Sequence, residues 1–551
     1  MQSITCYPTF VDLLGDRAKS NPDARAFVFL KDGETEQGSL TYQELDHRAR
    51  AIAAYLLERA NIGDRALLIY PYPAGLEFIE AFLGCLYAGI IAVPCHPPRN
   101  RQTIQDVSDR LISSGATVIL TPKSTQAKLK QQLCSGDESS LARSSQWVIT
   151  DQIPTSIATT WHSPALSPEA IAFLQYTSGS TGLPKGVMVT HRALLHNQQL
   201  LKLAFGHTEK LIGVGWLPLF HDMGLIGNVL QSLYVGTSCV LMSPLDFIQK
   251  PIRWLQAIST YKATTSGGPN FAYDLLCRYV TDDQLQHLDL TSWDVAFSGA
   301  EPVRPATLKQ FAAKFSVCGF RYDAFYPCYG MAEATLFITG GKKAEPPQIR
   351  DVDIAALEQN QVVWSHSAST SNTRPLVGCG HAWLDNQLLI VDPVTRQPCV
   401  ADQVGEIWVS GSGLGSGYWQ QPDKTEETFN AYLANSDNGP YLRTGDLGVV
   451  REGELFITGR LHDVLVFWGL NHYPHHIEHT VETCHPGFQV GSGAAFSIQV
   501  NGSDRLVVVQ EVKPRYRNRL VVEDVVESIR WAVFDQHFID VYAIVLAKPG
   551  R

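Results

Sequence analysis

The segment from Tyr176 to Gly186 brings together residue types that bind phosphate. It reads Tyr-Thr-Ser-Gly-Ser-Thr-Gly-Leu-Pro-Lys-Gly and stands between the apolar runs 171–174 and 187–189. Its glycines permit close approach of the backbone, its hydroxyl and N–H groups can surround phosphate oxygens, and Lys185 adds a positive charge. A Walker A loop would need Ser or Thr after the lysine, where Gly186 stands. The segment predicts a phosphate-binding loop of another kind; a plain Ser/Gly loop is the alternative.

Four further motifs follow in order along the chain. They are Ser298-Gly299-Ala300-Glu301-Pro302, Tyr329-Gly330-Met331-Ala332-Glu333, Tyr441-Leu442-Arg443-Thr444-Gly445-Asp446 and Gly459-Arg460-Leu461-His462-Asp463. With the loop, they resemble the adenylate-forming superfamily, which includes acyl-CoA synthetases, peptide-synthetase adenylation domains and luciferases. The resemblance extends over nearly the whole chain and implies an enzyme that uses ATP.

The resemblance also implies a role for each motif in a nucleotide site. The phosphates would be surrounded by Thr177, Ser178, Gly179, Ser180, Thr181, Gly182 and Lys185. The adenine pocket would be lined by Gly299, Ala300, Glu301, Pro302, Tyr329, Gly330 and Met331, with the Tyr329 ring stacked on the base. Asp446 would hold the ribose hydroxyls, and Arg460 would lie near the ribose and the α-phosphate. These residue types suit their roles, since an aromatic face stacks on a purine and a carboxylate accepts from two hydroxyls.

A metal ion and an acid-binding pocket are implied by the same resemblance. Glu333 would bind Mg²⁺ on the phosphates and Thr181 would complete that site, because hard cations prefer oxygen ligands. His221, within Trp216-Leu217-Pro218-Leu219-Phe220-His221-Asp222-Met223-Gly224, would shape or gate the entry of the acid. The predicted catalytic set is therefore Lys185, Glu333, Arg460 and His221. Outside the motifs, such carboxylates are more often solvated surface acids and such a histidine more often structural.

Several stretches resemble the fatty acyl-AMP ligases more than the acyl-CoA synthetases. They are 73–78, 92–98, 376–380 and Asn471-His472-Tyr473-Pro474, together with an extra segment from Gly341 to Arg374. In those ligases such an insertion limits the closing motion needed for CoA thioesterification. The acyl-AMP would then pass to the phosphopantetheine arm of an acyl carrier protein or carrier domain.

The chain departs from that family in two places. Trp468 and Leu470 stand where these ligases usually carry arginines, so the hinge surface that meets the carrier arm is expected to differ. The chain ends at Lys548-Pro549-Gly550-Arg551, where the family normally continues into a segment whose last lysine stabilises the developing charge. A fragment, a domain of a longer megasynthase and a truncated gene product are all compatible with this ending, and activity without that lysine is left open.

Alternating apolar runs indicate the elements that position these motifs. A helix is expected to Leu57 behind a Thr41 cap, and the runs 65–70, 76–87 and 89–93 suggest a β-α-β unit. Similar runs recur at 117–120, 170–175, 238–242, 264–266 and 295–298. This predicts an α/β fold with parallel sheets covered by helices. Segments 135–145 and 366–374 look like surface loops.

Two domains are predicted. Residues 1–459 would form a large adenylation domain of helix-covered sheets, with a β-rich lobe over 404–450 and the insertion at about 341–374. Residues 460–551 would form a small, mobile C-terminal α+β domain that is incomplete at its end.

Composition excludes several classes of function. The 551 residues carry a net charge of −10 without a Lys/Arg stripe, which argues against nucleic acid as a partner. Cysteines without a C-x-x-C pair indicate reduced thiols and a cytoplasmic location. The N-terminus does not read as a signal peptide, and the apolar stretch 81–94 is shorter than the roughly 20 residues of a transmembrane helix.

The leading hypothesis is ATP-dependent activation of a long-chain fatty acid to acyl-AMP with release of pyrophosphate. The product would be transferred to a carrier protein in polyketide, lipopeptide or lipid biosynthesis. Phe220 and the run 295–297 surround the expected α-amine anchor with apolar side chains, which favours a fatty acid over an amino acid. The alternatives are a long-chain acyl-CoA synthetase and a non-catalytic module that binds a nucleotide or acyl-adenylate.

Overall fold

The computed structural model of the protein describes residues 7–134, 140–177, 184–365, 372–468, 470–500 and 503–550. By internal contacts the chain divides into two units. The first comprises Met1–Gln348, Cys379–Leu388 and Val409–Arg443, and the second comprises Ile349–Gly378, Leu389–Trp408 and Thr444–Arg551. The domain boundary between residues 459 and 460 stays a prediction.

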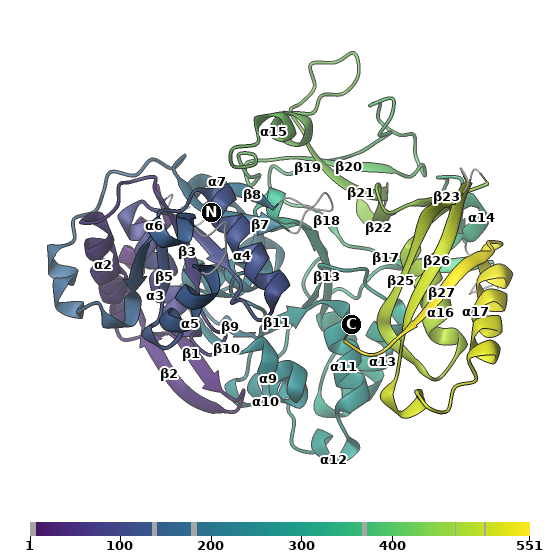
Figure 1. Ribbon diagram of the computed structural model, residues 1–551, viewed down its shortest axis with the longest axis horizontal. Coiled ribbons are helices and arrows are strands. Elements are labelled where there is room, and N and C mark those ends of the chain that lie inside the picture. The colour runs from purple at the N-terminus through teal and green to yellow at the C-terminus, as the bar shows by residue number, and fades with distance from the viewer. Residues whose placement is uncertain are drawn as a thin grey trace. The chain divides into compact units, whose positions relative to one another are not determined.

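A six-stranded sheet in the first unit carries the phosphate-loop motif (Figure 1). Its order is β6 (Gln146–Ile149), β5 (Val118–Thr121), β3 (Arg65–Ile69), β4 (Ile91–Cys95), β7 (Ile171–Thr177) and β8 (Lys185–Thr190). Strands β3 and β4 are parallel and are joined by helix α3 (Gly75–Ala88), which confirms the predicted β-α-β unit. Strand β8 pairs antiparallel with β7.

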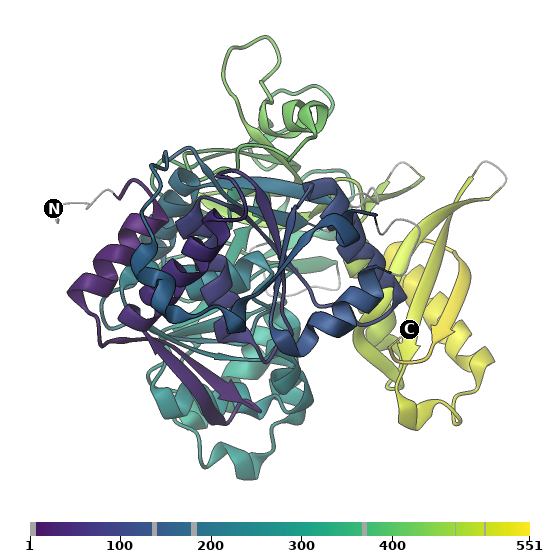
Figure 2. The same ribbon diagram turned by 60° about the vertical axis from the view of Figure 1, so that its left-hand side comes forward.

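A nine-stranded sheet in the same unit carries the next two motifs. Its order is β18 (His381–Ala382), β14 (Phe337–Gly340), β13 (Phe325–Gly330), β12 (Val295–Ser298), β11 (Thr265–Gly268), β9 (Ile212–Gly215), β10 (Ser238–Met242), β1 (Arg25–Lys31) and β2 (Thr35–Thr41). Its edge hairpin β1–β2 is drawn in purple in Figure 2. The expectation of parallel sheets is confirmed for the central strands. It is wrong for the hairpins β1–β2, β7–β8 and β13–β14, because such short connections cannot provide a parallel crossover.

Most helices of the described residues belong to the first unit (Figure 1). They are α1 (Phe10–Ser20), α2 (Tyr42–Leu57), α4 (Arg101–Ser114), α5 (Lys123–Leu133), α6 (Ser140–Ser144), α7 (His191–Ala204), a π-helix (Met223–Leu230), α8 (Gln231–Val235), α9 (Pro244–Gln249), α10 (Ile252–Tyr261), α11 (Asn270–Tyr279), α12 (Asp282–Leu285), α13 (Pro305–Phe315) and α15 (Pro422–Phe429). Helix α2 begins as predicted, with Thr41 and Glu44 forming a reciprocal capping box. Among the described helices, none is both long and apolar enough to cross a membrane.

The two predicted surface loops are only partly loops. Ser140–Ser144 is the short helix α6, and Thr373 and Arg374 begin strand β17 (Thr373–Val377). Strand β17 pairs with β15 (Ile349–Asp353), so these polar residues lie in a ladder that their own composition does not signal. The remaining parts of the two segments at 135–139 and 366–371 lie outside the described residues.

Among the described residues, the second unit contains four small sheets, one of which has strands that extend into the first unit. Their strands are β15 with β16 (Trp364–Ser365) and β17; β19 (Gln387–Val391), β20 (Gly405–Ser410), β21 (Leu442–Arg451) and β22 (Glu454–Arg460); β23 (Leu465–Phe467) and β24 (Leu470–His472); and β25 (Phe488–Val500), β26 (Ser503–Val512) and β27 (Val541–Ala547). Its helices are α14 (Ile354–Leu357), α16 (Pro474–Cys484) and α17 (Val522–His537).

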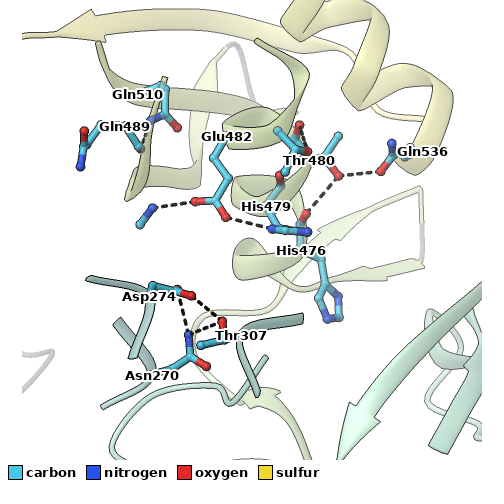
Figure 3. Close-up of polar contacts among 12 residues, drawn as sticks. Asn270, Asp274, Thr307, His476, His479, Thr480, Glu482, Gln489, Gln510 and Gln536 are labelled. Atoms are coloured by element: carbon cyan, nitrogen blue, oxygen red, sulfur yellow. Dashed lines mark hydrogen bonds and ion pairs between the residues drawn. The ribbon is translucent and has the colours of Figure 1, made fainter. Parts of the chain in front are cut away.

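Helices α16 and α17 share one apolar core with the sheet β25–β26–β27 (Figure 1). Ile477 from α16 and Ile529 from α17 are fully buried there beside Phe488 and Leu506. On the polar side of α16, Glu482 Oε1 lies 2.9 Å from His479 Nδ1 (Figure 3), and Glu482 Oε2 accepts the Gly491 N–H of β25 at 2.7 Å. Figure 3 also shows the cluster of Asn270, Asp274 and Thr307 in the first unit.

The inserted segment folds together with the C-terminal part of the chain in the second unit. Val352 and Leu357 are buried in one core with Phe456 and Tyr473. The Asn471 N–H donates to the Glu358 carbonyl oxygen at 2.9 Å. An isolated antiparallel β-bridge between Gly378 and Phe456 adds a second backbone contact between these parts of the chain. The insertion therefore packs on the tail of the chain; its effect on lobe rotation stays a prediction.

Candidate functional site

The predicted phosphate loop closes a β-hairpin. Thr177, the last residue of β7, is paired with Lys185, the first residue of β8, so the two stand opposite each other at the ends of the hairpin strands. Gly186 faces the Tyr176 ring, and a Cβ there would lie 2.9 Å from its Cζ atom. The loop residues Ser178, Gly179, Ser180, Thr181 and Gly182 lie outside the described residues.

Glu333 lies close to this hairpin. It follows β13 in a short helical turn, Ala332–Ala334, and only 7% of it is exposed. Its Oε1 atom accepts a hydrogen bond of 2.8 Å from the Tyr418 hydroxyl. Burial raises the pKa of Glu333 above its ordinary value, although the Tyr418 hydrogen bond and the positive charge of Lys185 oppose this rise. The structure thus brings Lys185 and Glu333 near each other, and their roles in one nucleotide site stay predictions.

Glu333 also meets the chemical requirements for a magnesium ligand. Mg²⁺ in proteins is commonly held by one or two carboxylates and by substrate phosphates. Glu333 is a carboxylate next to the hairpin, and the charge of Asp222 also acts on it. The described residues hold no group of three or more His, Cys, Asp or Glu that would bind a metal by itself. The donor set therefore fits an ion that arrives with phosphates; Thr181, the second predicted ligand, lies outside the described residues.

His221 is coupled to its neighbour Asp222. His221 Nδ1 lies 2.6 Å from Asp222 Oδ1, and 53% of the histidine side chain is exposed. Desolvation lowers the pKa of His221, but the hydrogen bond to Asp222 and its charge more than offset this, so the pKa is raised. Asp222 also caps the π-helix by accepting the Met223 N–H at 2.7 Å. Gly224 is required there, because a Cβ would lie 2.2 Å from the Pro218 carbonyl oxygen.

Aromatic side chains gather beside His221. The Phe220 ring lies 6.0 Å from the rings of Tyr72 and His96, measured between centroids. The Gln175 side chain on β7 donates to the Phe220 carbonyl oxygen at 3.1 Å. His96 belongs to the stretch 92–98 that resembles fatty acyl-AMP ligases, and Tyr72 directly precedes the stretch 73–78, so both stretches approach the predicted pocket mouth.

The predicted adenine motifs lie at the carboxyl ends of two neighbouring strands in the nine-stranded sheet. Strands β12 and β13 are parallel, and Gly299–Pro302 follows the former while Tyr329 and Gly330 end the latter. Ala300 has a φ of +68°, and Glu301 Oε1 accepts the Phe271 N–H at 2.5 Å. Tyr329 is buried and Met331 donates its N–H to the Leu336 carbonyl oxygen at 2.8 Å. The contact of these residues with adenine stays a prediction.

Asp446 and Arg460 form a pair within the second unit. They are opposite each other on β21 and β22, with Arg460 Nε 3.2 Å from Asp446 Oδ1. The Arg460 side chain is 71% exposed and that of Asp446 is 13% exposed. Gly445 has a φ of +71°, and its N–H donates to Glu406 Oε1 at 3.2 Å. The guanidinium is thus presented to solvent beside a largely buried carboxylate.

Sequence reasoning missed two residues of this site. Tyr418 lies 85 positions from the carboxylate it contacts, and Asp222 was quoted only as part of the His221 motif. The available signal for Tyr418 was the glycine-rich run before it. Gly415 donates its N–H to the Glu333 carbonyl oxygen at 2.8 Å, and a Cβ there would lie 2.7 Å from Val187 Cγ1. Such glycines indicate close approach of two backbones.

Two family models match the chain. One, described as AMP-binding enzyme, matches residues 14–419, and the other, described as Disco-interacting protein 2-like, AMP domain, matches residues 462–551. Nearly the whole chain is therefore covered by models of AMP-related domains.

Relatives and solved structures match the chain over almost its full length. The medium-chain-fatty-acid–acyl-carrier-protein ligase JamA of Moorena producens is 45% identical over 548 residues, 99% of this chain and 92% of the relative. A ligase of the same description, TtuA of Teredinibacter turnerae, is 37% identical, and the match covers 98% of this chain and 90% of TtuA. The fatty acyl-adenylate ligase from L. pneumophila, solved with acyl adenylate and pyrophosphate, is 38% identical with a TM-score of 0.80, covering 99% of this chain and 94% of that one.

Proposed function

Because the chain belongs to the AMP-binding enzyme family and, within it, to the fatty acyl-AMP ligases, we propose that it activates a medium- to long-chain fatty acid with ATP. The acid's carboxylate oxygen attacks the α-phosphorus of ATP, the bond to the β-phosphate oxygen breaks, and pyrophosphate leaves. The thiol of a carrier-bound phosphopantetheine arm then attacks the acyl carbonyl carbon, and AMP leaves. The single observation that carries this proposal is the convergence of Lys185 and Glu333 beside the loop hairpin in a chain with these relatives.

Each described residue has a proposed task in the first step. Lys185 neutralises phosphate charge at the hairpin, and Gly299–Pro302 with Tyr329 hold the adenine. Asp446 accepts from the ribose hydroxyls while Arg460 attracts the α-phosphate. Mg²⁺ bound through Glu333 and phosphate oxygens would neutralise the charge that develops on pyrophosphate. Catalysis then depends mainly on positioning and electrostatic stabilisation.

His221 has a proposed task at the mouth of the acid pocket. The residues around it, Tyr72, His96 and Phe220, offer ring surfaces to an acyl chain. Its raised pKa favours the protonated ring near neutral pH relative to an ordinary histidine, although Asp222 already balances this charge. A cationic or polarised ring at this point attracts the substrate carboxylate toward the phosphates.

The proposed acceptor is an acyl carrier protein or a carrier domain. The names of JamA and TtuA, which describe ligation to an acyl carrier protein, support it. The insertion supports it as well, because its packing on the tail would restrain the lobe rotation that CoA thioesterification needs. The proposed compartment is the cytoplasm, where ATP is supplied and thiols stay reduced.

The test is ATP–pyrophosphate exchange against a panel of fatty acids and amino acids, followed by acyl transfer to a phosphopantetheinylated carrier or to free CoA. Exchange that depends on a fatty acid, with transfer to the carrier only, is expected. ATP binding without exchange for any acid would identify a non-catalytic module, and equal rates of acyl-CoA and acyl-AMP formation would identify an acyl-CoA synthetase. The assay is run on this chain and on one extended past Arg551 by the family's lysine segment.

A further inference from the structure

The buried side chain of Tyr418 contacts both the Glu333 carboxylate and the Lys185 ammonium group. The Tyr418 hydroxyl donates to Glu333 Oε1 at 2.8 Å, and Lys185 Nζ lies 5.2 Å from the centroid of the Tyr418 ring. Only 4% of Tyr418 is exposed. Lys185 makes no ion pair with a described carboxylate within 4.0 Å. We propose that Tyr418 is a positioning residue: its hydroxyl orients the Glu333 carboxylate, and its ring holds the Lys185 ammonium apart from it.

The backbone fixes Tyr418 between the two groups. Trp419 N–H donates to the Gly186 carbonyl oxygen at 2.8 Å, and Met188 N–H donates to the Gly417 carbonyl oxygen at 2.9 Å, so the segment runs beside the strand that carries Lys185. Tyr418 N–H donates to Thr425 Oγ1 at 2.9 Å. The Phe429 ring packs edge-on against the phenol, 5.1 Å between centroids. The phenol therefore has little freedom to leave this position.

The chemistry of the contact explains why a tyrosine serves here. A buried carboxylate beside a lysine would otherwise be free to form a direct ion pair, which would occupy both the metal ligand and the phosphate-binding cation. A phenol hydroxyl donates one hydrogen bond to one oxygen and leaves the remaining lone pairs of the carboxylate for a cation. The ring face attracts an ammonium by a cation–π interaction without neutralising it.

The inference rests on the proposed function, and Tyr418→Phe tests it. This variant keeps the ring over Lys185 and removes only the hydrogen bond to Glu333. Supporting partners of a metal ligand typically contribute 10–100-fold in metal affinity, so the Mg²⁺ concentration for half-maximal exchange should rise by about tenfold or more. The matched control is Tyr42→Phe, which removes another buried hydroxyl, one that donates to the Thr237 carbonyl oxygen at 2.8 Å. It should leave the Mg²⁺ requirement unchanged.

A direct binding measurement separates the positioning role of Tyr418 from the proposed function. Titration calorimetry compares ATP binding with and without Mg²⁺ in the unmodified protein and in Tyr418→Phe. The expected result is that the variant loses the Mg²⁺-dependent part of the affinity and keeps the part that ATP alone supplies. An unmodified protein that binds no nucleotide would overturn both the proposed function and this inference. Equal Mg²⁺-dependent affinity in both proteins would overturn the inference and leave the proposed function standing.

A second variant covers a failure of Tyr418→Phe to fold. Thr425→Val removes the acceptor of the Tyr418 N–H and leaves the phenol in place. It should shift the Mg²⁺ requirement in the same direction by about fivefold, since one net hydrogen bond is worth roughly 1 kcal/mol. If Tyr418→Phe does not fold, an unchanged Mg²⁺ requirement in Thr425→Val refutes the positioning role.

Discussion

Lowering the pH from 7 to 5 is expected to destabilise the second unit through its buried histidines. His472 and His537 are 4% and 3% exposed. Burial, together with the smaller effect of the Arg374 charge, lowers the pKa of His472 to about 4 and that of His537 to about 3. Burial also lowers the pKa of His476, followed by the charges of His475 and of Arg374, whose guanidinium contacts His476 Nδ1. At neutral pH these rings are uncharged in the folded chain.

The sign follows from proton binding. A histidine in the unfolded chain has a pKa of about 6.5 and takes up a proton as the pH falls below that value, whereas the buried ring does not until about pH 4 or 3. The unfolded state therefore binds more protons over this window, and the free energy of unfolding falls as the pH falls. Integrated from pH 7 to 5, the loss is about 2 kcal/mol for His472 and about 2 kcal/mol for His537.

Hydrogen exchange measures this effect in the unit itself. Protection factors of peptides from α16 and α17, corrected for intrinsic exchange, should fall between pH 7 and 5. In His537→Gln the fall should be smaller by about 2 kcal/mol, or roughly 30-fold in protection, because one titrating group is gone. His462→Gln, an exposed position of the same unit, is the control and should behave like the unmodified protein. Burial also lowers the pKa of His191 and His207 in the first unit, so they too destabilise the folded chain as the pH falls. The His537→Gln variant is therefore compared with the unmodified protein at each pH. An identical fall in His537→Gln and the unmodified protein would refute the reasoning.

Three further outcomes are expected. Glu333→Gln should keep its thermal unfolding temperature within a few degrees and lose at least about 100-fold in exchange, because a neutral amide replaces the carboxylate; unchanged exchange would remove Glu333 from the site. Dodecanoate should support faster exchange at low concentration than any amino acid, since each buried methylene adds about 0.8 kcal/mol; a better amino acid would reject the lipid assignment. Arg374→Met, which breaks the contact with His476, should raise acyl-CoA formation relative to acyl-AMP accumulation. It is a milder test than deleting 341–374, which would also remove the core residues Val352 and Leu357, and an unchanged ratio would refute the proposed restraint.

Elements with a local signal in the sequence were predictable. The Thr41 cap, the unit β3–α3–β4 and the strand β12 are each specified by a cap residue or a short apolar run. Composition predicted a loop between the apolar runs 171–174 and 187–189, and strands β7 and β8 lie on either side of it; the binding of phosphate there stays a prediction. The direction in which neighbouring strands pair could not be predicted from the residues. Nothing in the run 187–189 distinguishes an antiparallel partner of β7 from a parallel one, and the pairing is decided by the short connection.

Contacts between distant segments were not predictable in the same way. Arg374 was assigned to a polar loop, but the pairing of β17 with β15 places it in a strand, in contact with His476. The glycine-rich run before Tyr418 indicates a close backbone approach but not the role of the phenol, since aromatic residues after glycines occur in many loops. Its role becomes visible only when the segment is laid against β8 and Glu333.

Backbone strain supports the assignment of the site independently of any relative. Thr335, two residues after Glu333, has a φ of +64°, which is unusual for a β-branched side chain and costs on the order of 1–3 kcal/mol. The turn is held there because Thr335 Oγ1 donates to the Gly413 carbonyl oxygen at 2.7 Å, and Asn197 Nδ2 donates to the carbonyl oxygens of Ala334 and Phe337. A glycine at this position would relieve the strain, but it would also lose the hydroxyl that ties the turn to the segment leading to Tyr418. The strained threonine therefore fixes the turn that carries Glu333 to the same segment that delivers the phenol, and this is the arrangement that a positioned carboxylate requires.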